Sequence, residues 1–213
     1  MKFDELMQVV GSEAVFETGL LLAGDVDAAD VRRQLSRWVA SGQLLRLRRG
    51  LYALAPPYQQ RQPHPFLVAN RLAPGSYVTA QSALAHAGLI PEHAPAVVSA
   101  STGRPGRRET SLGRFVFRHL KPDLLWGYRR LDLGQQQAAF VATPEKALLD
   151  LVHLSPQGDA LAFLSGLRLQ NLDLLDLTRL LAFAQRTRRP KLRRAAQRLA
   201  RLAASEAAEY VPR

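Results

Sequence analysis

Six arginines and no acidic residue fall between residues 31 and 58, directly after a stretch rich in acids. Residues 1–30 carry seven acids and one lysine, so the net charge changes from −6 to +6 between these two segments. An arginine side chain presents a planar fork of donors that matches phosphate oxygens and the edge of guanine. The chemistry that this segment favours is therefore nucleic-acid binding. With one neighbouring serine, the candidate DNA-contacting residues are Arg32, Arg33, Ser36, Arg37, Arg46, Arg48 and Arg49.

A predicted helix positions the first four of these residues. Asp27 is suited to cap a helix over residues 28–40. Arg33, Ser36 and Arg37 project from the side of this helix opposite to an apolar stripe, with Arg32 on the flank. The stripe, which should pack against the rest of the protein, consists of Val31, Leu35, Trp38 and Val39.

A predicted hairpin positions the other three arginines. Residues 44–47 alternate as a strand, residues 48–50 are predicted to turn at a glycine, and residues 51–54 return as a second strand. Apolar spacing predicts two earlier helices over residues 3–10 and 14–23, ended by Gly11 and Gly24.

This order of elements predicts a winged helix-turn-helix in residues 1–57. Its third helix would present side chains to base edges, and the wing cations would hold phosphates. The same fold also serves as a protein-interaction module, in which the arginines would form only a solvated basic face. The separation of the acids from this face favours DNA.

Two further groups of arginines could contact an anionic partner. The loop over residues 102–108 has the Gly-x-x-Gly character of loops that clamp a phosphate backbone, although a flexible hairpin loop explains it more simply. On the final helix, after Pro190, a solvated exterior is the simpler interpretation of the arginines. The residues of this possible second surface are Arg104, Arg107, Arg108, Arg194, Arg198 and Arg201.

The sequence favours no catalytic, cofactor or metal site. It has no nucleophile-elbow, Walker, dinucleotide-binding or zinc-protease motif, no cysteine, and five histidines without metal-ligand spacing. Glu145, Asp150 and His153 are close in sequence. However, Glu145 belongs to a helix start, and Asp150 and His153 are expected at exposed positions of an amphipathic helix. We therefore predict that the protein is not an enzyme.

The rest of the chain predicts a mixed region followed by helices. The polar residues 58–64 are predicted to form a linker with little to bury. Helices are expected over residues 65–72 and 80–86 and from Pro144 onward, with Thr79 and Thr143 as caps. The expected strands cover residues 96–100, 114–120 and 139–142.

The predicted fold class is therefore α+β. A winged helix-turn-helix domain in residues 1–57 and a linker over 58–64 precede a C-terminal domain of residues 65–213. The last part of that domain should be helical, with helices over residues 172–183 and after Pro190.

Composition adds general limits. Hydrophobic residues make up 47% of the 213 residues and charged residues 22%, which is typical of a packed protein. The longest apolar runs are far short of the roughly 20 residues needed to span a bilayer, and the N-terminus lacks a signal-peptide pattern, so we expect a soluble cytoplasmic protein. The formal net charge of +11 is carried mainly by arginine, which a GC-rich genome would also favour. The clustering of arginines in residues 31–58, rather than the overall composition, therefore indicates nucleic-acid binding.

Three blocks of sequence, in order, resemble the AbiEi-type antitoxins. These are transcriptional regulators paired with abortive-infection toxins. The blocks are LSRWVASGQLLRLRRGLYAL at residues 35–54, YVTAQSAL at 77–84 followed by Gly88-Leu89, and ATPEKALLDL at 142–151.

The resemblance implies a winged helix that binds inverted repeats in its own promoter, which two copies could occupy as a dimer. It also implies a C-terminal region that counteracts a nucleotidyltransferase-type toxin encoded beside it. The rival hypotheses are an interaction-only winged-helix protein and a nucleic-acid enzyme.

Overall fold

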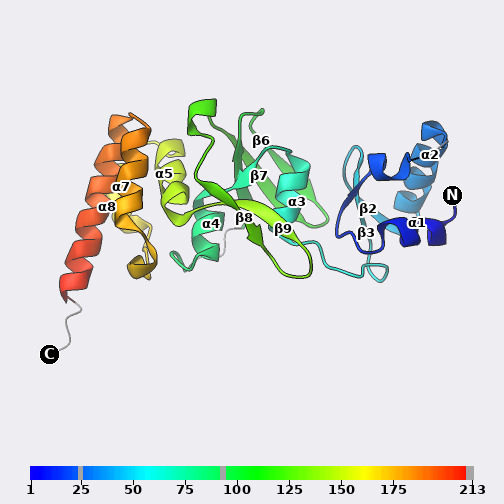
Figure 1. Cartoon of the computed structure of the whole chain (residues 1–213), viewed down its shortest axis with the longest axis horizontal. Helices are drawn as coiled ribbons and strands as arrows, with labels where there is room; N and C mark the ends of the chain where they lie inside the picture. Colours follow the sequence, from blue (N-terminus) through cyan, green and yellow to red (C-terminus); the bar gives the residue numbers. More distant parts are fainter. Residues whose placement is uncertain (24–25, 92–94, 210–213) are drawn as a thin grey trace.

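The computed structural model describes residues 1–23, 26–91 and 95–209. The chain is elongated, with a winged-helix region at the N-terminal end, a six-stranded sheet in the middle and a group of helices at the C-terminal end (Figure 1). The predicted α+β fold class is confirmed.

The winged-helix region contains a three-stranded antiparallel sheet in the order β1-β3-β2. In the described residues of this region three helices accompany the sheet, and two of them, α1 and α2, have the predicted bounds. The elements are α1 (Phe3–Val10), β1 (Phe16–Glu17), the 3-10 helix η1 (Thr18–Leu21), α2 (Ala28–Ala40), β2 (Leu44–Arg48) and β3 (Leu51–Leu54).

The helix predicted over residues 14–23 is wrong, because its residues form β1 and η1 instead. Phe16 pairs with Tyr52 of β3, and their rings stack with centroids 5.9 Å apart. Val15 and Phe16 are both buried, but they belong to different hydrophobic clusters. Cross-strand pairing thus overrides the apolar spacing that favoured a helix. The predicted end of this helix, Gly24, lies outside the described residues.

The small sheet is covered on both faces. All four residues of β3 are buried. Tyr52 and Leu54 pack into the core formed with α1 and α2, whereas Leu51 and Ala53 join the large core of the following region. The winged-helix region therefore shares a core with the rest of the chain.

The polar segment 58–64, which we predicted as a linker, makes hydrogen bonds to residues on both sides of it. Arg61 Nη1 donates to the carbonyl oxygen of Ser12 at 2.9 Å. Gln137 Nε2 donates to the carbonyl oxygen of Gln62 at 3.0 Å, and Gln137 Oε1 accepts from the backbone N–H of His64 at 2.8 Å. These hydrogen bonds join polar side chains to backbone groups, so the spacing of apolar residues could not predict them.

The middle of the chain forms a mixed sheet in the order β6-β7-β5-β4-β9-β8. Helix α3 packs against β4, β5 and β9, and α4 packs against α5. The elements of this region are α3 (Pro65–Leu72), β4 (Tyr77–Val78), α4 (Ala80–His86), β5 (Val97–Ser101), β6 (Gly106–Thr110), β7 (Gly113–His119), η2 (Pro122–Leu124), β8 (Tyr128–Asp132), β9 (Ala138–Ala142) and α5 (Pro144–Leu154).

Strands β6 and β8 were not predicted, and they are the two edges of the sheet. Most of their residues are exposed, so neither strand has the apolar alternation that marks a half-buried strand. Arg107 and Arg108 consequently lie on edge strand β6, not in the flexible loop that we predicted.

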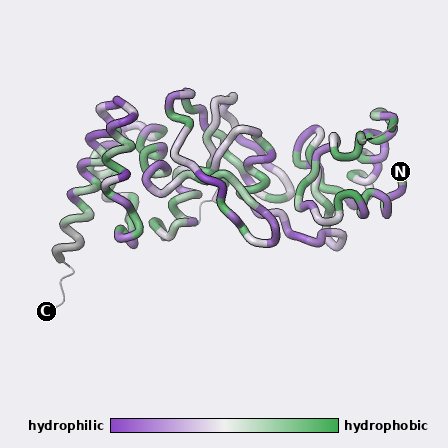
Figure 2. Tube along the Cα trace, in the orientation of Figure 1, coloured by the Kyte–Doolittle hydropathy of each residue, from purple (hydrophilic) through white to green (hydrophobic). Residues whose placement is uncertain are grey.

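The C-terminal part is helical, as predicted, and none of the helices in the described ranges is both long and apolar enough to cross a membrane. It contains α6 (Leu161–Gly166), the 3-10 helix η3 (Leu172–Leu174), α7 (Leu177–Arg186) and α8 (Pro190–Glu209). The helix predicted over residues 172–183 is divided, because Asp176 caps a new helix by accepting from the N–H of Arg179 at 2.8 Å. Hydrophilic and hydrophobic residues alternate along α7 and α8 (Figure 2), and α7 packs against α8.

Candidate nucleic-acid interface and a buried polar cluster

Helix α2 presents the predicted side chains to solvent. Asp27 caps it by accepting from the backbone N–H of Ala29 at 2.7 Å. Val31, Leu35 and Trp38 are buried on its inner side. The four candidate residues on α2 are all exposed: Arg32, Arg33, Ser36 and Arg37.

These four side chains differ in their contacts. Among the described residues, the side chains of Arg32 and Arg37 have no hydrogen-bond or ion-pair partner, whereas Ser36 Oγ donates to the carbonyl oxygen of Arg32 at 2.9 Å. Arg33 forms an ion pair with Asp30 on the same helix. The expected separation of acids from this face is therefore incomplete. An exposed pair of this kind contributes little to stability, so Arg33 can exchange Asp30 for another anion.

The wing presents two arginines rather than three. Arg46 and Arg49 are exposed and, within the described ranges, have no side-chain partner. Arg48 Nη2 instead contacts Glu17 Oε1 at 3.1 Å and the carbonyl oxygen of Arg71 at 3.2 Å. An acid thus lies beside Arg48, so the expected separation of the acids from the arginines is incomplete in the wing as well.

Strand pairing explains the position of Arg48. Glu17 of β1 and Arg48 of β2 both pair with Leu51, on opposite sides of β3. A register shift between Arg46 and Arg48 accommodates the buried Leu47. Because β1 was predicted as a helix, this contact could not be predicted from the sequence.

The wing contacts predict different salt dependences for neighbouring arginines. Arg49→Ala should make the fall of the DNA-binding constant with salt less steep for any duplex, because one phosphate contact disappears. The slope of log binding constant against log salt concentration should decrease in magnitude by about 0.9. Arg48→Ala should leave the slope nearly unchanged, because its guanidinium is bonded within the protein. Fluorescence anisotropy over a range of salt concentrations measures both slopes. An equal reduction by the two variants would contradict the assignment.

The possible second anionic surface divides into two parts. Arg104, Arg107 and Arg108 are exposed, and their side chains have no partner among the residues that the structure describes. The arginines of α8 make intramolecular contacts instead.

Arg194 Nη2 pairs with Asp159 Oδ2 at 2.7 Å, and Arg198 donates to the carbonyl oxygen of Asp159. The hydrogen bond from Arg194 lowers the pKa of Asp159. Arg194 and Arg198 thus fasten α8 to the turn before α6, while Arg201 lies further along α8 at an exposed position.

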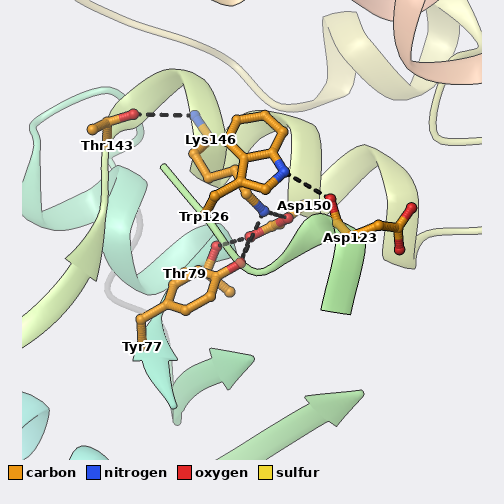
Figure 3. Close-up of polar contacts among 7 residues, drawn as sticks. All are labelled: Tyr77, Thr79, Asp123, Trp126, Thr143, Lys146 and Asp150. Atoms are coloured by element: carbon orange, nitrogen blue, oxygen red, sulfur yellow. Dashed lines mark hydrogen bonds and ion pairs between the residues drawn. The ribbon is translucent and has the colours of Figure 1, made fainter. Parts of the chain in front are cut away.

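A buried cluster of polar side chains joins β4 to α5 (Figure 3). Asp150 Oδ2 accepts from the hydroxyls of Tyr77 and Thr79, each at 2.8 Å. Asp150 Oδ1 forms an ion pair with Lys146 Nζ, which also donates to the Tyr77 hydroxyl at 2.8 Å. The side chains of Lys146 and Asp150 are only 1% and 2% exposed.

The prediction that Asp150 is exposed is therefore wrong. Residues 145–152 of α5 are all buried, so α5 has no exposed face there on which a carboxylate could lie. Thr79 does not cap α4 with its side chain, because its hydroxyl donates to Asp150 instead. Thr143 does cap α5, accepting from the N–H of Lys146 at 3.4 Å.

Aromatic rings cover the Lys146 amine. Its Nζ lies 5.3 Å from the centre of the Tyr77 ring and 5.4 Å from that of Trp126. Burial lowers the pKa of Lys146, although the nearby Asp150 carboxylate opposes this change. Burial, followed by the charge of Asp150, raises the pKa of Tyr77. Because each polar group has a partner within it, the cluster is suited to joining β4 to α5.

Glu145, Asp150 and His153 do not combine into a catalytic arrangement. Glu145 Oε1 accepts from the N–H of Asp176 at 3.1 Å and so holds the start of α7. His153 is half-buried, and burial lowers its pKa. The three residues thus have different surroundings and different partners.

Comparisons with known proteins identify the N-terminal segment. Residues 17–55 match the family model described as "Transcriptional regulator, AbiEi antitoxin", which confirms the resemblance of the first block, at residues 35–54. The blocks at 77–84 and 142–151 lie outside the matched residues. This segment runs from β1 to the residue after β3 and contains all seven candidate DNA-contacting residues.

A search of curated proteins finds no match. Among solved structures, the chain is similar to the Rv2827c protein of Mycobacterium tuberculosis, with a TM-score of 0.47 and 19% sequence identity. That alignment covers 99% of this chain and 82% of the other.

Proposed function

We propose that this chain is a DNA-binding autorepressor and the antitoxin of a bacterial toxin–antitoxin pair of the abortive-infection type. One observation carries the proposal. The segment that matches the AbiEi regulators is also the segment in which a capped helix and a wing present arginines to solvent.

The proposed complex follows the usual geometry of a winged helix on DNA. Helix α2 would enter the major groove, where Arg33 and Arg37 reach base edges. Arg32, Arg46 and Arg49 would contact phosphates and fix the orientation. Two copies on an inverted repeat in the chain's own promoter would double these contacts.

We further propose a division of labour along the chain. Residues 1–57 would bind DNA, and residues 65–213 would counteract a nucleotidyltransferase-type toxin. The shared core and the contacts of segment 58–64 support a fixed arrangement of the two parts. Full-length variants, rather than fragments, therefore test this division most cleanly.

A reporter assay tests both activities together. The upstream region of the gene would drive a reporter, and the neighbouring toxin gene would be expressed to score growth. Wild type should repress the reporter and protect the cells. The double variant Arg33→Ala/Arg37→Ala should lose repression but keep protection, because both substitutions are exposed and confined to α2.

The matched control is Arg129→Ala, which removes an exposed arginine from β8. It should retain both activities. Wild type that neither represses nor binds the promoter would favour the interaction-only winged helix. Loss of protection together with repression, in a variant that remains folded, would contradict the division of labour.

A further inference from the structure

A groove of about 550 Å³ lies between the winged-helix region and the sheet. Residues 12–14 line it on one side, and α3, β8 and β9 line it on the other, with Arg61 contributing from the intervening segment. This volume is within the range of about 300–1,000 Å³ that is usual for small-molecule sites. Clefts between structural units are common positions for such sites.

The groove carries an excess of positive charge. Arg61, Arg71 and Arg130 line it, against a single acid, Glu13. Arg61 crosses it by donating to the carbonyl oxygen of Ser12 at 2.9 Å. The guanidinium groups of Arg71 and Arg130 are exposed and, in the described part of the chain, make no hydrogen bond or ion pair. The charge favours an anionic ligand.

Two exposed aromatic rings lie beside these arginines. Tyr128 is 39% exposed and Phe140 is 47% exposed, and their centroids are 5.9 Å apart with the planes at 84°. Tyr128 is held from behind by stacking on Tyr77 at 4.6 Å. Arg130 and Phe140 are direct cross-strand partners in the β8–β9 pair. Preorganised rings next to cations favour a ligand with a planar ring.

Two buried polar atoms of groove-lining residues have no partner among the described residues. They are Ser76 Oγ and Asn70 Nδ2. Ser76 is only 3% exposed. The Asn70 amide is oriented by its Oδ1, which accepts from the N–H of Phe140 at 2.6 Å. Buried polar atoms are nearly always bonded, and these two belong to residues that line the groove.

We propose that this groove binds a nucleoside 5′-phosphate. The phosphate would contact Arg71 and Arg130, and the base would lie against Tyr128 and Phe140. Phosphate alone would leave the rings unused, and an apolar ligand would leave the arginines unused. The proposal does not depend on DNA binding.

Isothermal titration calorimetry on the full-length chain tests the proposal. The probes are AMP, GMP, CMP and UMP, with adenosine and inorganic phosphate as probes for each half of the ligand. At least one nucleotide should bind at one site and at least about tenfold more tightly than either half, which corresponds to about 1.4 kcal/mol.

Two variants and one control locate the site. Phe140→Ala should weaken nucleotide binding by about 5–150-fold, which is the usual value of one stacked base. Arg130→Gln should weaken it by about tenfold, the equivalent of one charged hydrogen bond. Arg129→Gln should bind as wild type, because Arg129 is a neighbouring exposed arginine that does not line the groove.

The positions of Phe140 and Arg130 are exposed, so both variants should fold, and circular dichroism without ligand checks this. Three results would overturn the proposal: no binding by any of the four nucleotides at millimolar concentration, equal binding of inorganic phosphate, or binding unchanged by Phe140→Ala and Arg130→Gln.

Discussion

Replacing Asp150 with alanine is expected to lower the free energy of unfolding by about 3–5 kcal/mol at neutral pH. The substitution leaves the Lys146 amine buried without its counter-charge. It also removes the acceptor of the Tyr77 and Thr79 hydroxyls. Urea unfolding followed by circular dichroism measures the loss.

Two comparisons make the result specific. Asp173→Ala removes an exposed carboxylate from η3 and should change stability by less than about 0.5 kcal/mol. Lys146→Met combined with Asp150→Leu removes both buried charges and should cost less than Asp150→Ala alone. A loss below about 1 kcal/mol for Asp150→Ala would contradict a paired, charged cluster.

The loss of stability in Asp150→Ala should depend on pH in a definite direction. Burial lowers the pKa of Lys146 below its ordinary value of 10.5, and Asp150 raises it again. Without Asp150 the folded-state pKa falls further, so the unfolded chain binds more protons over a wider range below 10.5. The stability deficit of Asp150→Ala should therefore shrink as the pH rises from about 7 to about 9. A deficit that grows over this range would contradict the account.

Replacing Arg37 with alanine is expected to weaken binding to the promoter site by about 1–3 kcal/mol, with a smaller loss on scrambled DNA. Arg37 is exposed on α2 and, as far as the described residues show, has no partner to give up on binding. Arg33→Ala should have an effect of the same kind but no larger, because Arg33 must first leave Asp30. Equal losses on both duplexes would reassign these residues as phosphate contacts.

The winged helix illustrates what local sequence can predict. The bounds of α1 and α2, the Asp27 cap and the exposed positions of Arg33 and Arg37 all follow from residues within one or two helical turns. The contacts of Arg48 do not follow from nearby residues, because its guanidinium bonds Glu17 of β1 and the carbonyl oxygen of Arg71 in α3. Long-range pairing is invisible to a periodicity argument.

The buried cluster has a different cause. The spacing of Lys146 and Asp150 is typical of an exposed ion pair on a helix, and the spacing itself does not distinguish the buried case. The only available signal was the surrounding block, Ala147-Leu148-Leu149 with Leu151-Val152, which is apolar on nearly every side of the helix. Such a helix is buried all round, and its polar residues are buried with it.

Sequence-specific DNA binding by the winged helix can be tested with one ratio of affinities. Fluorescence anisotropy would compare the full chain on its own upstream sequence and on a scrambled duplex of the same length and composition, at about 0.15 M salt. The upstream duplex should bind at least about 10³-fold more tightly, which is the lower end of the range for specific complexes. Equal affinities for the two duplexes would contradict sequence-specific binding.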